Sequence, residues 1–155
     1  MTINYSNYLE NEEWKFCVKK LPIIAIDLII KNKHSEILMG RRLNNPAKNS
    51  FFVPGGRIFK NEKIEDAIER ISNNEISKTY KIKDASFINY FEHFYPNSLW
   101  EEKDISTHYI VLAFSIKTNK EAFNLKNQHS EFKWISYKNQ ELYNIHEYST
   151  KYFNF

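Results

Sequence analysis

Apolar residues follow different spacings along this chain, and each spacing predicts a type of element. The run from Ile23 to Ile30 is almost continuously apolar and rich in Ile, which is typical of a buried strand. Residues Glu36 to Arg42 alternate between apolar and polar side chains, as a half-buried strand does. The segment Asn32 to Ser35 lies between them and has the composition of a turn. We therefore predict a β-hairpin in this part of the chain.

A helical spacing appears further along. The apolar positions follow the i, i+3, i+4, i+7 pattern of one helix face: Ile64, Ala67, Ile68 and Ile71. Acidic residues lie in or near the first turns, where the helix dipole favours negative charge: Glu62, Glu65 and Asp66. We expect Asn61 to cap this helix.

The remaining elements complete an α+β pattern. An amphipathic helix is expected over Tyr8 to Lys20, ending before Pro22. Strands are expected over Phe51 to Val53, where Pro54-Gly55-Gly56 stops the strand, and over Phe87 to Tyr95, His108 to Lys117 and Lys133 to Ser136. A last helix is expected near Tyr137 to Ile145. We predict a single domain, residues 1–155, with a mixed β-sheet sandwiched between helices. Residues 1–21 form an N-terminal segment whose aromatic residues are candidates for a dimer interface: Tyr5, Tyr8, Trp14 and Phe16.

Composition excludes several classes of protein. The net charge of +3 is small, and no Lys-rich run is interleaved with aromatic residues, so we expect no nucleic-acid partner. The longest apolar run, Leu21 to Ile30, holds Pro22 and Asp27 and is too short to span a bilayer, so we expect no membrane partner. Cys17 is the only cysteine, which excludes a disulfide framework and a thiolate metal site within one chain. A cytoplasmic location is the expectation that follows.

Glycine and arginine are confined to one part of the chain. All three glycines and all four arginines lie between Gly40 and Arg70. Glycine is needed where the backbone takes a positive φ or approaches a ligand closely, and arginine where a planar charged fork holds phosphate or carboxylate. The cluster therefore predicts an anion site, most simply a phosphate site, although a coding bias towards Lys is an alternative reason for the scarcity of Arg.

The spacing Gly56-x5-Glu62-x7-Arg70-x4-Glu75 places a strand, a Gly-rich loop and a helix in sequence. Glu75 follows Ile71 by one turn, so its carboxylate can point from the inner side of the helix towards the loop after Pro54. A carboxylate there suits Mg2+, which takes few protein oxygens together with phosphate oxygens. Arg70 is expected to pair with Glu62 or Glu69 and to hold the loop against the helix.

At these residues the chain resembles the Nudix hydrolases, with departures at Ile71, Asn74 and Ser77 from the Glu, Glu and Gly of their box. The departures, and further motifs, resemble one branch of that family, the GDP-mannose mannosyl hydrolases. These motifs cover nearly the whole chain: Gly40-Arg41-Arg42, Asn45-Pro46-Ala47, Phe52 to Arg57, His93-Phe94-Tyr95, Thr107-His108-Tyr109 and Asn127-Gln128-His129.

The resemblance implies a chemistry and a set of residues. In that branch water attacks C1 of the sugar with inversion and GDP leaves, which implies Mg2+-dependent hydrolysis of GDP-mannose or a related GDP-sugar by a homodimer. It implies that His129 is the general base, that the Gly55 carbonyl, Glu75 and Gln128 hold Mg2+, and that three residues stabilise the leaving diphosphate: Arg42, Arg57 and Tyr109. It also places Asp27, His93 and Arg70 at the substrate.

Other interpretations of these residues stay open at this point. From residue type alone, His129 also fits an ordinary loop histidine, and Asp27 fits a strand edge facing solvent. Residues 101–104 are expected to form a solvated loop, with the lining of a sugar pocket as the alternative. For the whole chain, the alternatives are an ordinary Nudix pyrophosphohydrolase, a nucleotide-sugar-binding domain without turnover, and an α+β domain whose arginines only form ion pairs.

Overall fold

In the computed structural model, which describes residues 9–120, 123 and 129–155, the strands form one mixed sheet. Its central path is β3 (Phe51–Phe52), β2 (Ile37–Arg42), β1 (Ile23–Lys31), β6 (Thr107–Lys117) and β5 (Ala85–Tyr95). β4 (Gly55–Arg57) pairs with β1, and β7 (His129–Ile135) pairs with β2. β1 and β6 are parallel, from Ile23 opposite Tyr109 to Lys31 opposite Lys117, whereas the other pairs are antiparallel.

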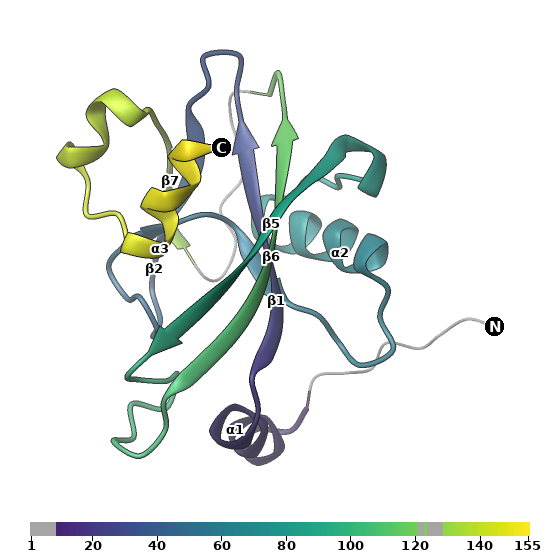
Figure 1. The fold of residues 1–155 in the computed structure, drawn as a ribbon, viewed down its shortest axis with the longest axis vertical. Helices are drawn as coiled ribbons and strands as arrows, with labels where there is room; N and C mark the ends of the chain where they lie inside the picture. The colour runs from purple at the N-terminus through teal and green to yellow at the C-terminus, as the bar shows by residue number, and fades with distance from the viewer. Residues whose placement is uncertain (1–8, 121–122, 124–128) are drawn as a thin grey trace.

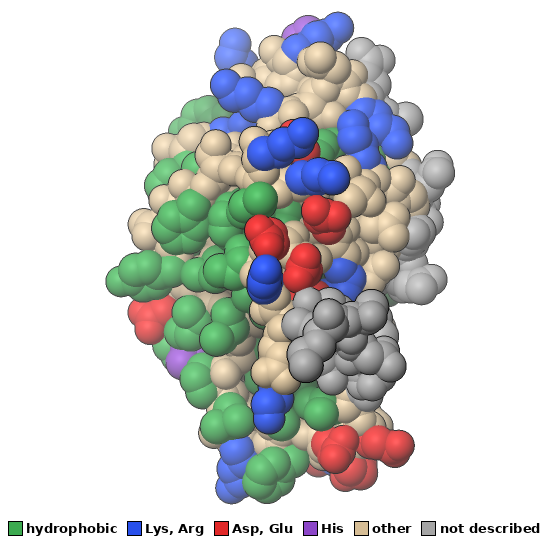
Figure 2. Space-filling view, turned by 90° about the vertical axis from the view of Figure 1, so that its right-hand side faces the viewer, with side chains coloured by type: hydrophobic (Ala, Val, Ile, Leu, Met, Phe, Trp, Pro, Cys, Tyr) green, Lys and Arg blue, Asp and Glu red, His purple; other side chains and the backbone are tan. Residues whose placement is uncertain are grey.

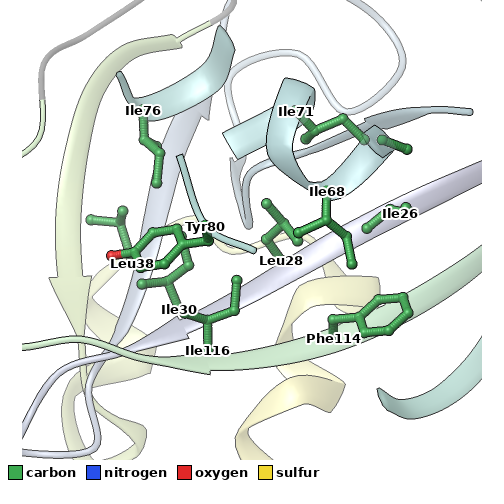
Figure 3. Close-up of a cluster of buried hydrophobic side chains, with 11 residues drawn as sticks. Ile26, Leu28, Ile30, Leu38, Ile68, Ile71, Ile76, Tyr80, Phe114 and Ile116 are labelled. Atoms are coloured by element: carbon green, nitrogen blue, oxygen red, sulfur yellow. The ribbon is translucent and has the colours of Figure 1, made fainter. Parts of the chain in front are cut away.

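Helices cover both faces of this sheet (Figure 1). α2 (Ile64–Ile76) lies on one face, where its apolar stripe packs on alternate residues of β1 (Figure 3). On the other face lie α3 (Glu147–Thr150) and η3 (Lys151–Asn154), whose Tyr152 packs in a cluster with Ile29 and Met39. Because neighbouring residues of β1 point to opposite faces and both faces are covered, the Ile-rich run from Ile26 to Ile30 is buried throughout.

α1 (Asn11–Lys20) closes one end of the molecule (Figure 1). Val18 on this helix packs with Ile23 and with Ile105, which precedes β6. The helix ends at Lys20, two positions before Pro22, as the sequence predicts, and begins at Asn11 with Glu10 and Glu13 forming a capping box. Tyr5 and Tyr8 lie outside the described residues.

Several predicted boundaries are wrong, for identifiable reasons. Asn61 does not cap α2: it takes a positive φ of 64° in the preceding turn, and the helix begins at Ile64. The strand that begins at Phe51 ends before Pro54, as predicted, but Gly55 begins a further strand, β4, because the chain after Pro54 turns back onto β1. β7 begins at His129, four positions before the predicted start at Lys133.

The C-terminal part is also more broken than the predicted single helix. Residues Tyr137–Leu142 form the 3-10 helix η2, and the short helices α3 and η3 follow. A further 3-10 helix, η1 (Ile82–Asp84), leads into β5.

One margin of the molecule carries exposed apolar side chains. β5 is the last strand on its side of the sheet, and Phe87, Tyr90 and Phe94 on this strand are 56%, 63% and 59% exposed. Figure 2 shows hydrophobic side chains gathered along one margin of the side that carries α2. Contiguous exposed apolar surface of this kind marks interaction sites in soluble proteins.

Candidate active site

Most of the candidate side chains meet in one cavity of about 300 Å3 between the sheet, α1 and the loop before β6. The candidate side chains in its lining come from five strands: Asp27 of β1, Arg42 of β2, Arg57 of β4, His93 of β5 and Tyr109 of β6, with Gly55 beside them. The strand register explains the convergence, because Asp27 is opposite Gly55, and His93 is opposite Tyr109. The fold thus brings these residues together in one cavity, as the resemblance noted in the sequence implies.

Asp27 is a buried acid at this cavity and does not face solvent at a strand edge. Its side chain is 6% exposed, and the hydroxyl of Tyr152 donates to its Oδ2 at 2.5 Å. Burial raises the pKa of Asp27 to about 7, while the hydrogen bond from Tyr152 and the charge of Arg42 act in the opposite direction. Asp27 is therefore the acid in this cavity that changes protonation near neutral pH.

The glycines allow other residues of the protein to lie close to the backbone. None of them has a positive φ. A Cβ on Gly55 would lie 2.6 Å from Asp27 Oδ1, and one on Gly40 would lie 2.4 Å from Cδ2 of His129. Both glycines therefore make room for candidate site residues of the protein itself, whereas the predicted roles were a positive φ or a close approach to a ligand.

The arginines divide between the lining of the cavity and a structural ion pair. Arg42 lines the cavity, and its Nε is buried without a hydrogen-bond partner among the described residues, so a ligand oxygen would satisfy it. Arg70 does not line the cavity. It donates to Glu62 from Nε at 2.6 Å and from Nη2 at 2.9 Å, which is the ion pair predicted from the sequence.

His93 and Tyr109 provide neutral polar groups. The His93 ring stacks on Tyr148 at 4.1 Å, and burial lowers the pKa of His93 to about 3, so the imidazole is neutral at physiological pH. Burial raises the pKa of Tyr109, against the charges of Arg42 and Arg57, so its phenol keeps its proton and can donate a hydrogen bond. The cavity thus combines guanidinium groups with uncharged donors, which suits a ligand that carries phosphate.

Glu75 of α2 and His129 of β7 lie next to each other, and neither lines this cavity. His129 Nδ1 is 3.3 Å from Glu75 Oε2, and both residues are buried. Glu75 lies one turn after Ile71, which packs against the position of Gly56. The structure therefore brings these two predicted residues together outside the lining of the cavity, with His129 opposite Arg42 in the pairing of β2 with β7.

Glu75 and His129 offer at most two side-chain ligands to a cation among the described residues. Apart from the 3.3 Å contact between Glu75 Oε2 and His129 Nδ1, these two atoms and His129 Nε2 are buried without a hydrogen-bond partner in the described part of the chain. A cation beside the carboxylate would offset its burial. Ile71 is buried in the core and Asn74 is exposed, so neither adds a carboxylate. No group of three or more His, Cys, Asp or Glu side chains suited to a metal occurs among the described residues. Gln128, the third predicted ligand, lies outside them.

Sequence reasoning missed the aromatic residues of the site. Trp14 and Trp100 line the cavity, while Tyr148 contacts His93 and Tyr152 contacts Asp27. Trp14 therefore faces the cavity, whereas Phe16 on the same helix is 63% exposed. The aromatic surplus in the composition was the signal, but it does not say which rings belong to the site.

Residues 21–153 match the family model of the NUDIX domain. The chain belongs to the Nudix hydrolases. Agl8 of Haloferax volcanii, a low-salt glycan biosynthesis protein, is 36% identical over 125 residues, which cover 81% of this chain and 78% of Agl8. The predicted Nudix fold, a mixed sheet between helices, is confirmed.

Solved structures share the fold of this Nudix hydrolase at low sequence identity. The NUDIX domain of Shewanella oneidensis NrtR, solved with ADP-ribose, has a TM-score of 0.67 at 12% identity, covering 99% of this chain and 95% of that one. A bifunctional NMN adenylyltransferase/ADP-ribose pyrophosphatase from Francisella tularensis, solved with AMP and a manganese ion, has a TM-score of 0.66 at 17% identity, covering 92% and 43%. Nudix hydrolases generally use divalent cations. Within the described residues, no helix has the length and apolar character needed to cross a membrane.

Proposed function

We propose that this Nudix hydrolase is a cytoplasmic, Mg2+-dependent enzyme that hydrolyses GDP-mannose, or a related GDP-sugar, to GDP and free sugar. The observation that carries the proposal is the single buried carboxylate on α2: Glu75 remains, while Ile71 and Asn74 occupy the other two acidic positions of the family pattern. Attack at phosphorus in this family commonly uses several metals held by several helix carboxylates. Attack at a sugar carbon needs mainly a stabilised leaving group and a base.

The proposed reaction forms a bond between water oxygen and C1 of the sugar and breaks the bond between C1 and the diphosphate oxygen. GDP leaves with the electron pair, and a base takes one proton from the water. Arg42 and Arg57 hold the departing diphosphate, and the protonated phenol of Tyr109 donates a hydrogen bond to it. Mg2+ bound by Glu75, the Gly55 carbonyl and Gln128 would supply further positive charge for the leaving group.

We assign the general base to His129. Its Nδ1 lies 3.3 Å from Glu75 Oε2, and its Nε2 is buried without a hydrogen-bond partner in the described residues, so Nε2 is the nitrogen that can accept a proton. His129 is opposite Arg42 in the pairing of β2 with β7, which connects it to the leaving-group side of the site. Asp27 is the second candidate, because it lines the cavity and its pKa is raised to about 7.

The relatives support a nucleotide-sugar ligand. Agl8 is named for glycan biosynthesis, and the NrtR domain was solved with ADP-ribose. The Francisella tularensis enzyme is named an ADP-ribose pyrophosphatase, which favours the second candidate function, cleavage of the diphosphate itself.

Hydrolysis in 18O-labelled water separates these functions. We expect the label on the C1 hydroxyl of the released sugar and none in GDP, measured by mass spectrometry of the products. Label in GMP or in a sugar phosphate would instead establish the pyrophosphohydrolase. Tight binding of GDP-mannose without any product would establish a binding domain without turnover.

We also propose that the enzyme is a homodimer formed through the exposed face of β5. Three aromatic side chains of this strand, each more than half exposed, offer roughly 300 Å2 of apolar surface, which is enough for the centre of an interface. Sedimentation analysis should give a dimer that Tyr90→Asp dissociates. A wild-type monomer at every concentration would contradict this assignment.

A further inference from the structure

The guanidinium group of Arg57 lies between two aromatic rings. Its Cζ is 4.5 Å from the centroid of the Trp14 ring and 4.5 Å from that of Phe59. Trp14 comes from α1, and Phe59 comes from the loop between β4 and α2, so two segments far apart in sequence contribute one ring each. A guanidinium over an aromatic face is attracted by the electrons of the ring.

The backbone on both sides of this arrangement is fixed by the ion pair of Arg70 with Glu62. Nη2 of Arg70 donates to the carbonyl of Arg57 at 2.8 Å, and the amide of Phe59 donates to Oε2 of Glu62 at 2.8 Å. The Arg70 guanidinium also lies 3.8 Å from the Phe59 ring centroid. The Phe59 ring therefore contacts both Arg57 and Arg70, and its backbone is fixed by Glu62.

Trp14 is held in place by contacts of α1 with the loop before β6. α1 is tied to the loop before β6 by an ion pair of Lys15 with Glu102 and by a hydrogen bond from Trp100 Nε1 to Asn11 Oδ1 at 2.8 Å. Trp14 also packs on the apolar cluster around Val18. Its ring consequently has little freedom to leave the guanidinium of Arg57.

We propose that Trp14 and Phe59 are positioning residues, which hold Arg57 in the orientation that binds the diphosphate of the ligand. A free arginine side chain has many rotamers, and fixing one of them on ligand binding opposes affinity. The two rings fix the guanidinium before the ligand arrives. This inference rests on the proposed diphosphate ligand, but not on which bond of that ligand is broken.

The test is a double-mutant cycle between Trp14 and Arg57, measured by calorimetric titration of the full chain with GDP in the presence of Mg2+. Trp14→Leu should weaken GDP binding by about tenfold. Trp14→Phe should recover much of the loss, because it restores an aromatic face. Phe16→Leu is the matched control, since Phe16 is an exposed aromatic residue of the same helix, and it should leave binding unchanged.

The cycle distinguishes positioning from a merely structural role. If Trp14 acts through Arg57, then adding Trp14→Leu to Arg57→Ala should cause no further loss of affinity. An equal loss in both backgrounds, or full affinity in Trp14→Leu, would overturn the proposal. If Trp14→Leu does not fold, a double-mutant cycle between Phe59 and Arg57, with Phe59→Leu and Phe59→Tyr in place of the Trp14 variants, tests the proposal in the same way.

The proposed GDP-sugar hydrolysis is judged separately, from the products of wild-type turnover. Inorganic pyrophosphate with Mg2+ serves as a second titrant, so the role of Trp14 is measured even if no GDP-sugar is cleaved. If the wild-type protein binds neither GDP nor pyrophosphate, Arg57 has no diphosphate to hold and the inference is wrong.

Discussion

Replacing Asp27 with Asn is expected to change how the stability of the protein depends on pH. Asp27 lies on the central strand of the sheet, is 6% exposed, and accepts a hydrogen bond from Tyr152 at 2.5 Å. Burial raises its pKa from the ordinary 3.8 to about 7. Asn is nearly isosteric, is neutral at all these pH values, and can still accept the hydrogen bond from Tyr152.

The sign and size of the effect follow from this shift. Because the pKa is higher in the folded state, the folded protein retains a proton that the unfolded chain has lost between pH 3.8 and about 7. The contribution of Asp27 to stability is therefore fully present below pH 3.8 and is lost as the pH rises to about 7. At 1.4 kcal/mol for each pKa unit, the whole loss is about 4 kcal/mol.

Urea unfolding at several pH values, with EDTA present to remove metal, measures this loss. The stability of Asp27→Asn relative to the wild type should rise by about 3 kcal/mol between about pH 5 and about pH 8. Asp104→Asn changes an exposed acid and is the matched control; its stability should follow the wild type. Parallel stability curves for Asp27→Asn and the wild type would refute the assignment of a raised pKa to this carboxyl.

The local patterns of the sequence predicted most elements but not the pairing of the short ones. The stripe from Ile64 to Ile71 and the Ile-rich run of β1 each carry a period that is visible in one segment. β4 has only three residues, so it shows no apolar period. It forms a strand because it pairs with β1, with Arg57 opposite Ala25 and Gly55 opposite Asp27. The short helices α3 and η3 likewise lack the length for a recognisable apolar stripe.

The same limit applies to the candidate site. The clustering of Gly and Arg in sequence predicted an anion site, and Arg42 and Arg57 do line one cavity. The placement of Trp14 over Arg57 depends on how α1 packs against the rest of the domain. No local spacing in the sequence predicts that packing. The placement of His129 next to Glu75, outside the lining of the cavity, is also a tertiary property, because the pairing of β7 with β2 sets it.

Three further substitutions test the proposed chemistry. Glu75→Gln removes the buried carboxylate beside α2, so we expect weaker Mg2+ binding by calorimetry and a severe fall in kcat; near-normal activity at low Mg2+ would exclude the metal assignment. Arg42→Lys keeps the charge but loses the planar fork, so kcat should fall by about tenfold to a thousandfold in steady-state assays, whereas a rise in KM alone would mean that Arg42 binds substrate and transition state equally. His129→Gln should lower kcat by about a hundredfold to ten-thousandfold and remove one ionisation from the pH profile, because Gln can hydrogen-bond but cannot accept a proton. A structural histidine would also slow the enzyme when replaced, but the ionisation would remain. Retention of that ionisation in His129→Gln, together with its loss in Asp27→Asn, would transfer the role of base to Asp27, whose pKa of about 7 predicts a rate that rises with pH through neutrality.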